Sequence, residues 1–182
     1  MRRLNESRAT SQDARLAVFI VGPTCSGKSE AGSHLSRKGF TWVEPSEFLK
    51  SKVPLDIPVL ERLQMVERFF EDAGRDYVAK RLLSDIIDGD KQPPFVITGC
   101  RQTIEVECLQ TRLATLVIAV HSEDAVRFER SSSRARPDLA MNYETFIRAT
   151  AGEYSIGLAK MIFEADDIIV NKRIPIRLPS RD

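Results

Sequence analysis

Five short apolar runs divide the chain, and longer stretches with apolar residues three or four positions apart lie between them. The runs are Leu16–Val21, Phe40–Val43, Phe95–Thr98, Leu116–Val120 and Ile168–Val170. Continuous apolar runs of this length are typical of parallel strands that are covered on both faces. Such strands alternate with helices in α/β proteins, so we expect an α/β fold.

The helical patterns are clearest in the middle of the chain. In residues 59–72, Leu63, Val66 and Phe70 fall on one face of the expected helix. The segment 76–87 repeats the pattern and predicts a second amphipathic helix. Further helices are expected at 29–38, 104–112, 123–132 and 143–165, and breaks between elements are expected at Pro54, Pro58, Pro93 and Pro94.

Composition narrows the class of protein. The length of 182 residues and the apolar fraction of 42% suit one domain, expected over 14–182, after a loose polar tail at 1–13. The 27 basic and 26 acidic residues nearly balance, so an anionic ligand must be bound by a local cluster of cations. No apolar run approaches the length of a membrane span. The cysteines and histidines lack metal-binding spacing, and a reduced, cytoplasmic protein is the simplest interpretation.

The segment after the first strand matches a phosphate-binding loop. Residues 22–29 read Gly-Pro-Thr-Cys-Ser-Gly-Lys-Ser, which satisfies the pattern G-x-x-x-x-G-K-[ST] at every fixed position. Glycines let backbone N–H groups point at phosphate oxygens, and the next helix adds its positive N-terminal end. Lys28 is expected to reach the β- and γ-phosphates of ATP, and Ser29 to bind Mg²⁺. The predicted nucleotide-binding residues are Gly22, Thr24, Cys25, Ser26, Gly27, Lys28 and Ser29.

Two strand ends supply candidates for the acceptor side. Arg101 follows the strand 95–98, and residues just past a parallel strand line the ligand crevice. Its guanidinium is suited to grip an acceptor phosphate, although an arginine solvated at a helix start has the same pattern. Glu47, with Glu44 as second candidate, follows the strand 40–43 and is suited to orient the acceptor or to bind Mg²⁺. The alternative for Glu47 is a helix-capping acid after Ser46.

A basic cluster follows the fourth strand. It comprises Arg127, Arg130, Arg134 and Arg136, and the serines at 131–133 and Pro137 indicate a loop at the helix end. A lid of this kind closes over phosphates and stabilises charge on the transferring group. We assign Arg130 and Arg134 this catalytic role; the alternative is a solvated basic turn.

Taken together, these residues resemble the dephospho-CoA kinase and nucleoside monophosphate kinase group of P-loop kinases, and are most similar to an archaeal branch of dephospho-CoA-kinase-like, adenylate-kinase-like ATPases. The resemblance runs from Val18 to Asn171 and includes residues 21–31, 38–40, 76–82, 99–101, 105–106, 126–130 and 165–171.

The resemblance implies a three-layer α/β/α P-loop fold with a five-stranded parallel sheet in the order 2-3-1-4-5. It implies an acceptor-binding insertion near residues 48–90 and a lid near 130–140. It further implies transfer of the γ-phosphoryl group of ATP, with Mg²⁺, to a nucleoside monophosphate or a similar nucleotide-like acceptor. Asn171 falls where such kinases place a loop near the adenine; the alternative is a plain turn residue.

Two positions depart from the pattern of that branch. Thr98 occupies a position where the branch usually carries an aspartate that helps to hold Mg²⁺, so that acid is missing unless Glu44, Glu47 or Asp124 substitutes for it. Arg148-Ala149-Thr150 replaces an Arg-Asp-charged pattern ahead of Gly157. A non-catalytic nucleotide-binding module, or one with weak ATPase activity, therefore stays open as the alternative. An ATPase that acts on a protein or RNA gains no support from the near-neutral charge, and the sequence gives no oligomeric state.

Overall fold

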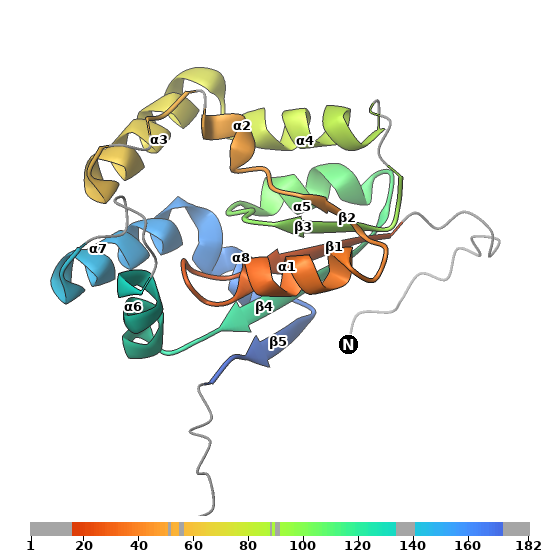
Figure 1. The fold of residues 1–182 in the computed structure, drawn as a ribbon. Helices are drawn as coiled ribbons and strands as arrows, with labels where there is room; N and C mark the ends of the chain where they lie inside the picture. Colours follow the sequence, from red (N-terminus) through yellow and green to blue (C-terminus); the bar gives the residue numbers. More distant parts are fainter. Residues whose placement is uncertain are drawn as a thin grey trace, which may run out of the picture.

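The computed structural model describes residues 16–50, 52–54, 57–87, 89, 92–133 and 141–172. Five parallel strands form one sheet in the order β2-β3-β1-β4-β5 (Figure 1). The predicted sheet order is confirmed. The strands are β1 (Leu16–Val21), β2 (Thr41–Val43), β3 (Phe95–Thr98), β4 (Ala114–His121) and β5 (Asp167–Val170).

Helices cover both faces of the sheet. On one face α1 (Lys28–Ser36) packs through Ala31 and Leu35 against Val18 and Ile20 of β1. On the other face, side chains of α4, α5 and α8 bury Ala17, Phe19 and Val21. Residues of β1 therefore alternate between two apolar layers, which explains why this strand is an unbroken apolar run. These helices are α4 (Tyr77–Ile87), α5 (Thr103–Gln110) and α8 (Ala159–Phe163).

Three further helices surround the carboxyl ends of the strands. They are α3 (Val59–Ala73), α6 (Asp124–Ser132) and α7 (Tyr143–Glu153), and α3 packs against α7. Figure 1 shows α3 and α7 on the same side of the molecule, beyond the end of the sheet that leads into α6. The short helix α2 (Glu47–Lys50) follows β2 and was not predicted. Among the described residues, no helix is both long enough and apolar enough to cross a membrane.

The expected single helix at 143–165 is wrong in one respect, because the structure divides it. A π-helical turn, η2 (Tyr154–Leu158), separates α7 from α8, and Gly157 inside it has φ +130°. A Cβ added at Gly157 would lie 2.7 Å from the backbone oxygen of Arg101. The helix is therefore interrupted where η2 passes the loop after β3, at a position that favours glycine.

Candidate functional site

The phosphate loop has a backbone that only its glycines fit. Gly22 has φ +147°, and a Cβ there would lie 2.4 Å from the backbone oxygen of Val120. Gly27 has φ +112° and precedes α1, and its Cβ would lie 2.4 Å from Nδ2 of Asn171. Cys25, with φ +63°, is the one non-glycine residue with positive φ among those described. The fixed glycines of the motif are thus needed for two reasons: the backbone curls at positive φ, and atoms of other segments lie too close to leave room for a side chain.

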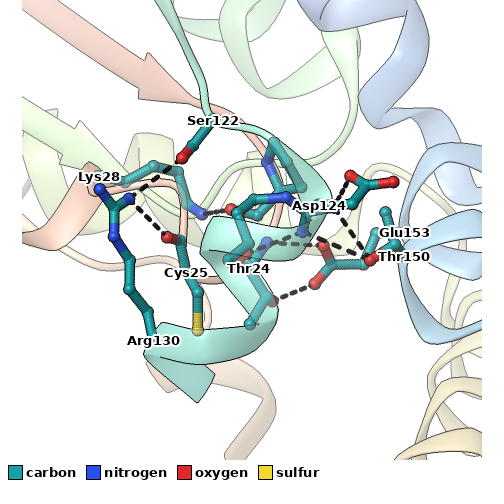
Figure 2. A network of polar contacts seen from close by, with 10 residues as sticks. Thr24, Cys25, Lys28, Ser122, Asp124, Arg130, Thr150 and Glu153 are labelled. Atoms are coloured by element: carbon teal, nitrogen blue, oxygen red, sulfur yellow. Dashed lines mark hydrogen bonds and ion pairs between the residues drawn. The ribbon is translucent and has the colours of Figure 1, made fainter. Parts of the chain in front are cut away.

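Carbonyl groups of the loop accept hydrogen bonds from Lys28 of the loop itself and from side chains of other elements. The side chain of Lys28 donates to the oxygen of Pro23 at 2.8 Å, and Nη1 of Arg127 donates to that of Thr24 at 3.0 Å. Nδ2 of Asn171 donates to the oxygen of Ser26 at 2.8 Å. Arg130 donates to the oxygen of Cys25 at 3.2 Å (Figure 2) and to that of Ser26 at 3.4 Å. With its carbonyls fixed in this way, the loop keeps the curled shape that phosphate binding needs.

Several features of the loop match the needs of a nucleotide. The hydroxyl of Ser26 is buried and has no hydrogen-bond partner, so it is a donor that a phosphate oxygen would satisfy. Desolvation lowers the pKa of Lys28 to about 8, although the negative charge of Glu153 opposes this shift. Ser29 lies exposed in the first turn of α1, where a hydroxyl is accessible to a metal ion. These residues fit ATP phosphates and a bound Mg²⁺.

Arg101 is joined to the phosphate loop through Glu153. Nη1 of Arg101 lies 2.8 Å from Oε1 of Glu153. The same carboxylate accepts from the backbone N–H of Thr24 at 2.8 Å and from the Thr24 hydroxyl. Burial tends to raise the pKa of Glu153, but Arg101, Lys28 and Thr24 outweigh it and hold the pKa below its ordinary value. The carboxylate is therefore ionised, and it connects the loop with the strand end after β3.

The backbone at Arg101 is itself fixed by a buried acid. Oε2 of Glu105 accepts from the N–H groups of Arg101 and Gln102 at 2.7 and 2.8 Å, within the capping box that begins α5. Burial raises the pKa of Glu105, although these two backbone donors oppose the shift. Glu105 therefore sets the direction in which Arg101 leaves the sheet.

Of the acids proposed to replace an aspartate at position 98, Glu44 lies beside Thr98. The indole of Trp42 donates to Oγ1 of Thr98 at 2.8 Å, and Thr98 donates to Oε1 of Glu44 at 3.1 Å. Glu47 is exposed at the start of α2. Asp124 pairs with Arg127 at 2.6 Å. The geometry thus favours Glu44 over Glu47, the first sequence candidate, as the acid at this strand end.

Two of the arginines expected in a lid, Arg127 and Arg130, lie on α6 and contact the phosphate loop. Arg127 is fully buried on α6, where its guanidinium lies 5.0 Å from the ring centre of Phe146. Arg130, also on α6, contacts the loop carbonyls and Ser122, and donates to Asn171 at 3.3 Å. Both therefore brace the phosphate loop from outside in this structure. The other two predicted members, Arg134 and Arg136, lie outside the described residues.

A cavity of about 190 Å³ adjoins Arg101 and Glu153 and is bounded by α3 and α7. Arg101, on the acceptor side, and Thr24, of the phosphate loop, both line this cavity.

Sequence reasoning missed Glu153, Glu105 and the structural role of Arg127. Glu153 gave no local signal, since its partner Thr24 is 129 positions away. Glu105 did have a local signal in the sequence, because it is an acid three residues after Gln102 at the start of a helix.

No family model matches the chain. A UPF0200 protein of Sulfurisphaera tokodaii is 30% identical over 155 residues, which cover 85% of this chain and 86% of the relative. One from Saccharolobus islandicus is 28% identical over 156 residues, covering 85% of this chain and 83% of the relative. One from Staphylothermus marinus is 36% identical over 99 residues, only 54% of this chain and 51% of that relative.

Solved structures with the same fold include shikimate kinases. That of Bacteroides thetaiotaomicron has a TM-score of 0.56 at 17% identity and covers 86% of this chain and 87% of its own. That of Acinetobacter baumannii, solved with shikimate, has a TM-score of 0.54 at 17% identity and covers 87% and 84%. At this identity the likeness establishes a P-loop kinase fold alone.

Proposed function

The chain belongs to the UPF0200 family, and from its P-loop kinase fold and the geometry of its phosphate loop we propose that it is an ATP-dependent phosphotransferase. The acceptor is a phosphorylated small molecule, and the resemblance to nucleoside monophosphate kinases favours a nucleotide-like one. The observation that carries the proposal is the Arg101–Glu153–Thr24 connection, because it links a cation for the acceptor to the loop for ATP in one cavity.

In the proposed reaction, an ionised phosphate oxygen of the acceptor attacks the γ-phosphorus of ATP. A new P–O bond forms, the bond between the γ-phosphorus and the β,γ-bridging oxygen breaks, and ADP leaves with that electron pair. No proton has to be removed, since the attacking oxygen is already ionised. Lys28 offsets charge on the transferring group, and Arg101 orients the acceptor.

Mg²⁺ fits the residues at the loop. No group of three or more His, Cys, Asp or Glu among the described residues forms a metal site by itself. Mg²⁺ usually uses one or two protein oxygens together with nucleotide phosphates and water. The hydroxyl of Ser29 would hold the ion, and Glu44 would hold it directly or through water. When bound, Mg²⁺ neutralises charge on the ATP phosphates.

The second candidate function is nucleotide binding without catalysis, because Thr98 stands where an acid is expected. A module that binds ATP without transferring its phosphate would keep the phosphate loop and the contacts that Arg127 and Arg130 of α6 make with it. Coupled assay of ADP release, with and without a panel of nucleoside monophosphates, separates the two. The phosphotransferase predicts ADP release that depends on one acceptor, whereas the binding module predicts none with any acceptor.

Lys28→Ala is the test variant for this assay, and Lys38→Ala, at an exposed lysine beyond the end of α1, is its matched control. Acceptor-dependent ADP release should be lost in the first variant and kept in the second. Equal rates in both would contradict the proposal.

A further inference from the structure

The cavity beside Arg101 has two chemically different ends. Polar lining residues come from the phosphate loop, from the segments after β2 and β3, and from the adjoining part of α7. They are Thr24, Ser46, Arg101, Gln102, Glu105, Thr150 and Glu153. The remainder of the lining is apolar apart from Arg62 on α3, and four apolar residues of the same helix, Val59, Leu63, Val66 and Phe70, belong to it. A ligand that fills the cavity therefore meets polar groups of the loop and strand ends together with the hydrocarbon of α3.

The apolar end is built mainly by one face of α3. Val59, Leu63, Val66 and Phe70 are spaced by three or four residues, and all four line the cavity. Phe70 is buried, but the other three stay partly exposed. Partly exposed valine and leucine side chains in a concave wall are suited to cover an apolar ligand.

Helix α7 supplies the facing wall. Phe146 and Ala149 line the cavity from this helix, and Leu49, Met141 and Ile156 add apolar surface around it. Leu63 of α3 lies so near α7 that a Cβ added at Gly152 would be 2.9 Å from its Cδ1. The two helices therefore meet beside the cavity, and the ligand would lie along both.

Arg101 supplies donors for an anion at the polar end. The two carboxylates of the lining are engaged: Glu153 with Arg101 and Thr24, and Glu105 with backbone N–H groups of Arg101 and Gln102. Arg101 uses Nη1 for Glu153 and is 34% exposed at its side chain. Its guanidinium therefore has further donors to offer a phosphate in the cavity.

We infer that the acceptor is a phosphate monoester whose body is predominantly apolar. This inference rests on the proposed phosphotransferase function. The acceptor still carries a phosphate, but the rest of the acceptor molecule is apolar instead of nucleotide-like. A nucleoside would bring ribose hydroxyls and polar base edges against the α3 wall, where Arg62 is the one polar side chain among the described lining residues. Polar groups that lose water without gaining partners weaken binding, whereas an alkyl or aryl body gains from the same wall.

The experiment is calorimetric titration of the full chain, with ADP and Mg²⁺ present, by inorganic phosphate, AMP, and ethyl, butyl and hexyl phosphate. Affinity should rise roughly fourfold for each added methylene, the value for burying one CH₂. Hexyl phosphate should bind at least tenfold more tightly than AMP. An affinity that is independent of chain length, or that is highest for AMP, would overturn the inference.

Val66→Thr places a hydroxyl on the α3 wall at nearly constant volume. This variant should reduce the gain in affinity for each methylene of the alkyl phosphates, while affinity for inorganic phosphate stays unchanged. Val170→Thr is the matched control, since Val170 is 51% exposed on the edge strand β5 and does not line the cavity. An unchanged dependence in Val66→Thr would count against the inference.

Turnover separates this inference from the function on which it rests. Tight, chain-length-dependent binding of hexyl phosphate without ADP formation from ATP would support the inference and contradict the phosphotransferase. Phosphorylation of AMP with weak binding of all alkyl phosphates would support the phosphotransferase and overturn the inference.

Discussion

The guanidinium of Arg101 and the carboxylate of Glu153, 2.8 Å apart, form an ion pair that joins the strand end after β3 to the phosphate loop. Each residue belongs to a different part of the crevice, so the pair ties the two parts together. Replacing one partner leaves the charge of the other without its opposite, and therefore affects stability.

Glu153→Gln should lower the free energy of unfolding by roughly 1–2 kcal/mol at pH 7, because the amide keeps a hydrogen bond to Thr24 but loses the charge that faces Arg101. The folded-state pKa of Glu153 lies below the ordinary glutamate value, so its stabilising effect is complete above that value and is lost as the pH falls through the folded pKa. Urea unfolding of both proteins from pH 7 to pH 3.5 measures this. A difference that grows as the pH falls would contradict the assignment.

Lys28→Met should abolish ATP turnover and leave the ligand-free protein at least as stable as the wild type. Burial depresses the pKa of Lys28 to about 8, so the charged ammonium is disfavoured in the unliganded fold and is retained for its ligand. Thermal unfolding without ligand, together with ADP release, measures both effects. Marked destabilisation would show that Lys28 serves the fold.

Arg101→Ala should weaken binding of the phosphorylated acceptor selectively, on the order of 2–5 kcal/mol if the acceptor phosphate stays buried and unpaired. Arg101→Lys should rescue poorly, since an ammonium does not reproduce the planar fork. Separate titrations with ATP and with the acceptor measure this. Equal weakening for both ligands would place Arg101 on the ATP side, and no effect would indicate a solvated surface residue.

Glu44→Gln should raise the Mg²⁺ concentration needed for half-maximal turnover by about tenfold, because the acid beside Thr98 is the nearest substitute for the missing aspartate. The comparison variants are Glu47→Gln, at an exposed position, and Asp124→Asn, which removes the charge that pairs with Arg127. Activity measured across Mg²⁺ concentrations ranks the three. A larger shift in Glu47→Gln would restore Glu47 as the acid of the site.

Local patterns predicted most of the sheet and the loop. β1 and β3 were predicted at their observed bounds, because strands buried on both faces are unbroken runs of apolar residues. The other three were predicted within two residues, and β5 is exposed along its length, unlike the strands covered on both faces that its apolar run predicted. The glycine pattern of the loop is local in the sequence, although the atoms that approach Gly22 and Gly27 most closely belong to the distant residues Val120 and Asn171.

The rest depends on residues that meet only in three dimensions. Glu153 looks like any acid in a helical stretch, and Thr24, its partner, is 129 positions away. Arg127 reads as part of a basic cluster, yet it is buried against Thr24, 103 positions distant. Gly157 resembles a tolerated helical glycine, and only the approach of Arg101 explains the π-helical turn there.

The most direct measurement is the fate of phosphate from ATP labelled at the γ-phosphorus, incubated with Mg²⁺ and the acceptor that stimulates ADP release most. We predict one labelled acceptor molecule for each ADP formed, and neither product with Lys28→Ala. Label found as inorganic phosphate at a rate independent of any acceptor, or binding of ATP with no ADP formed, would contradict the phosphotransferase function.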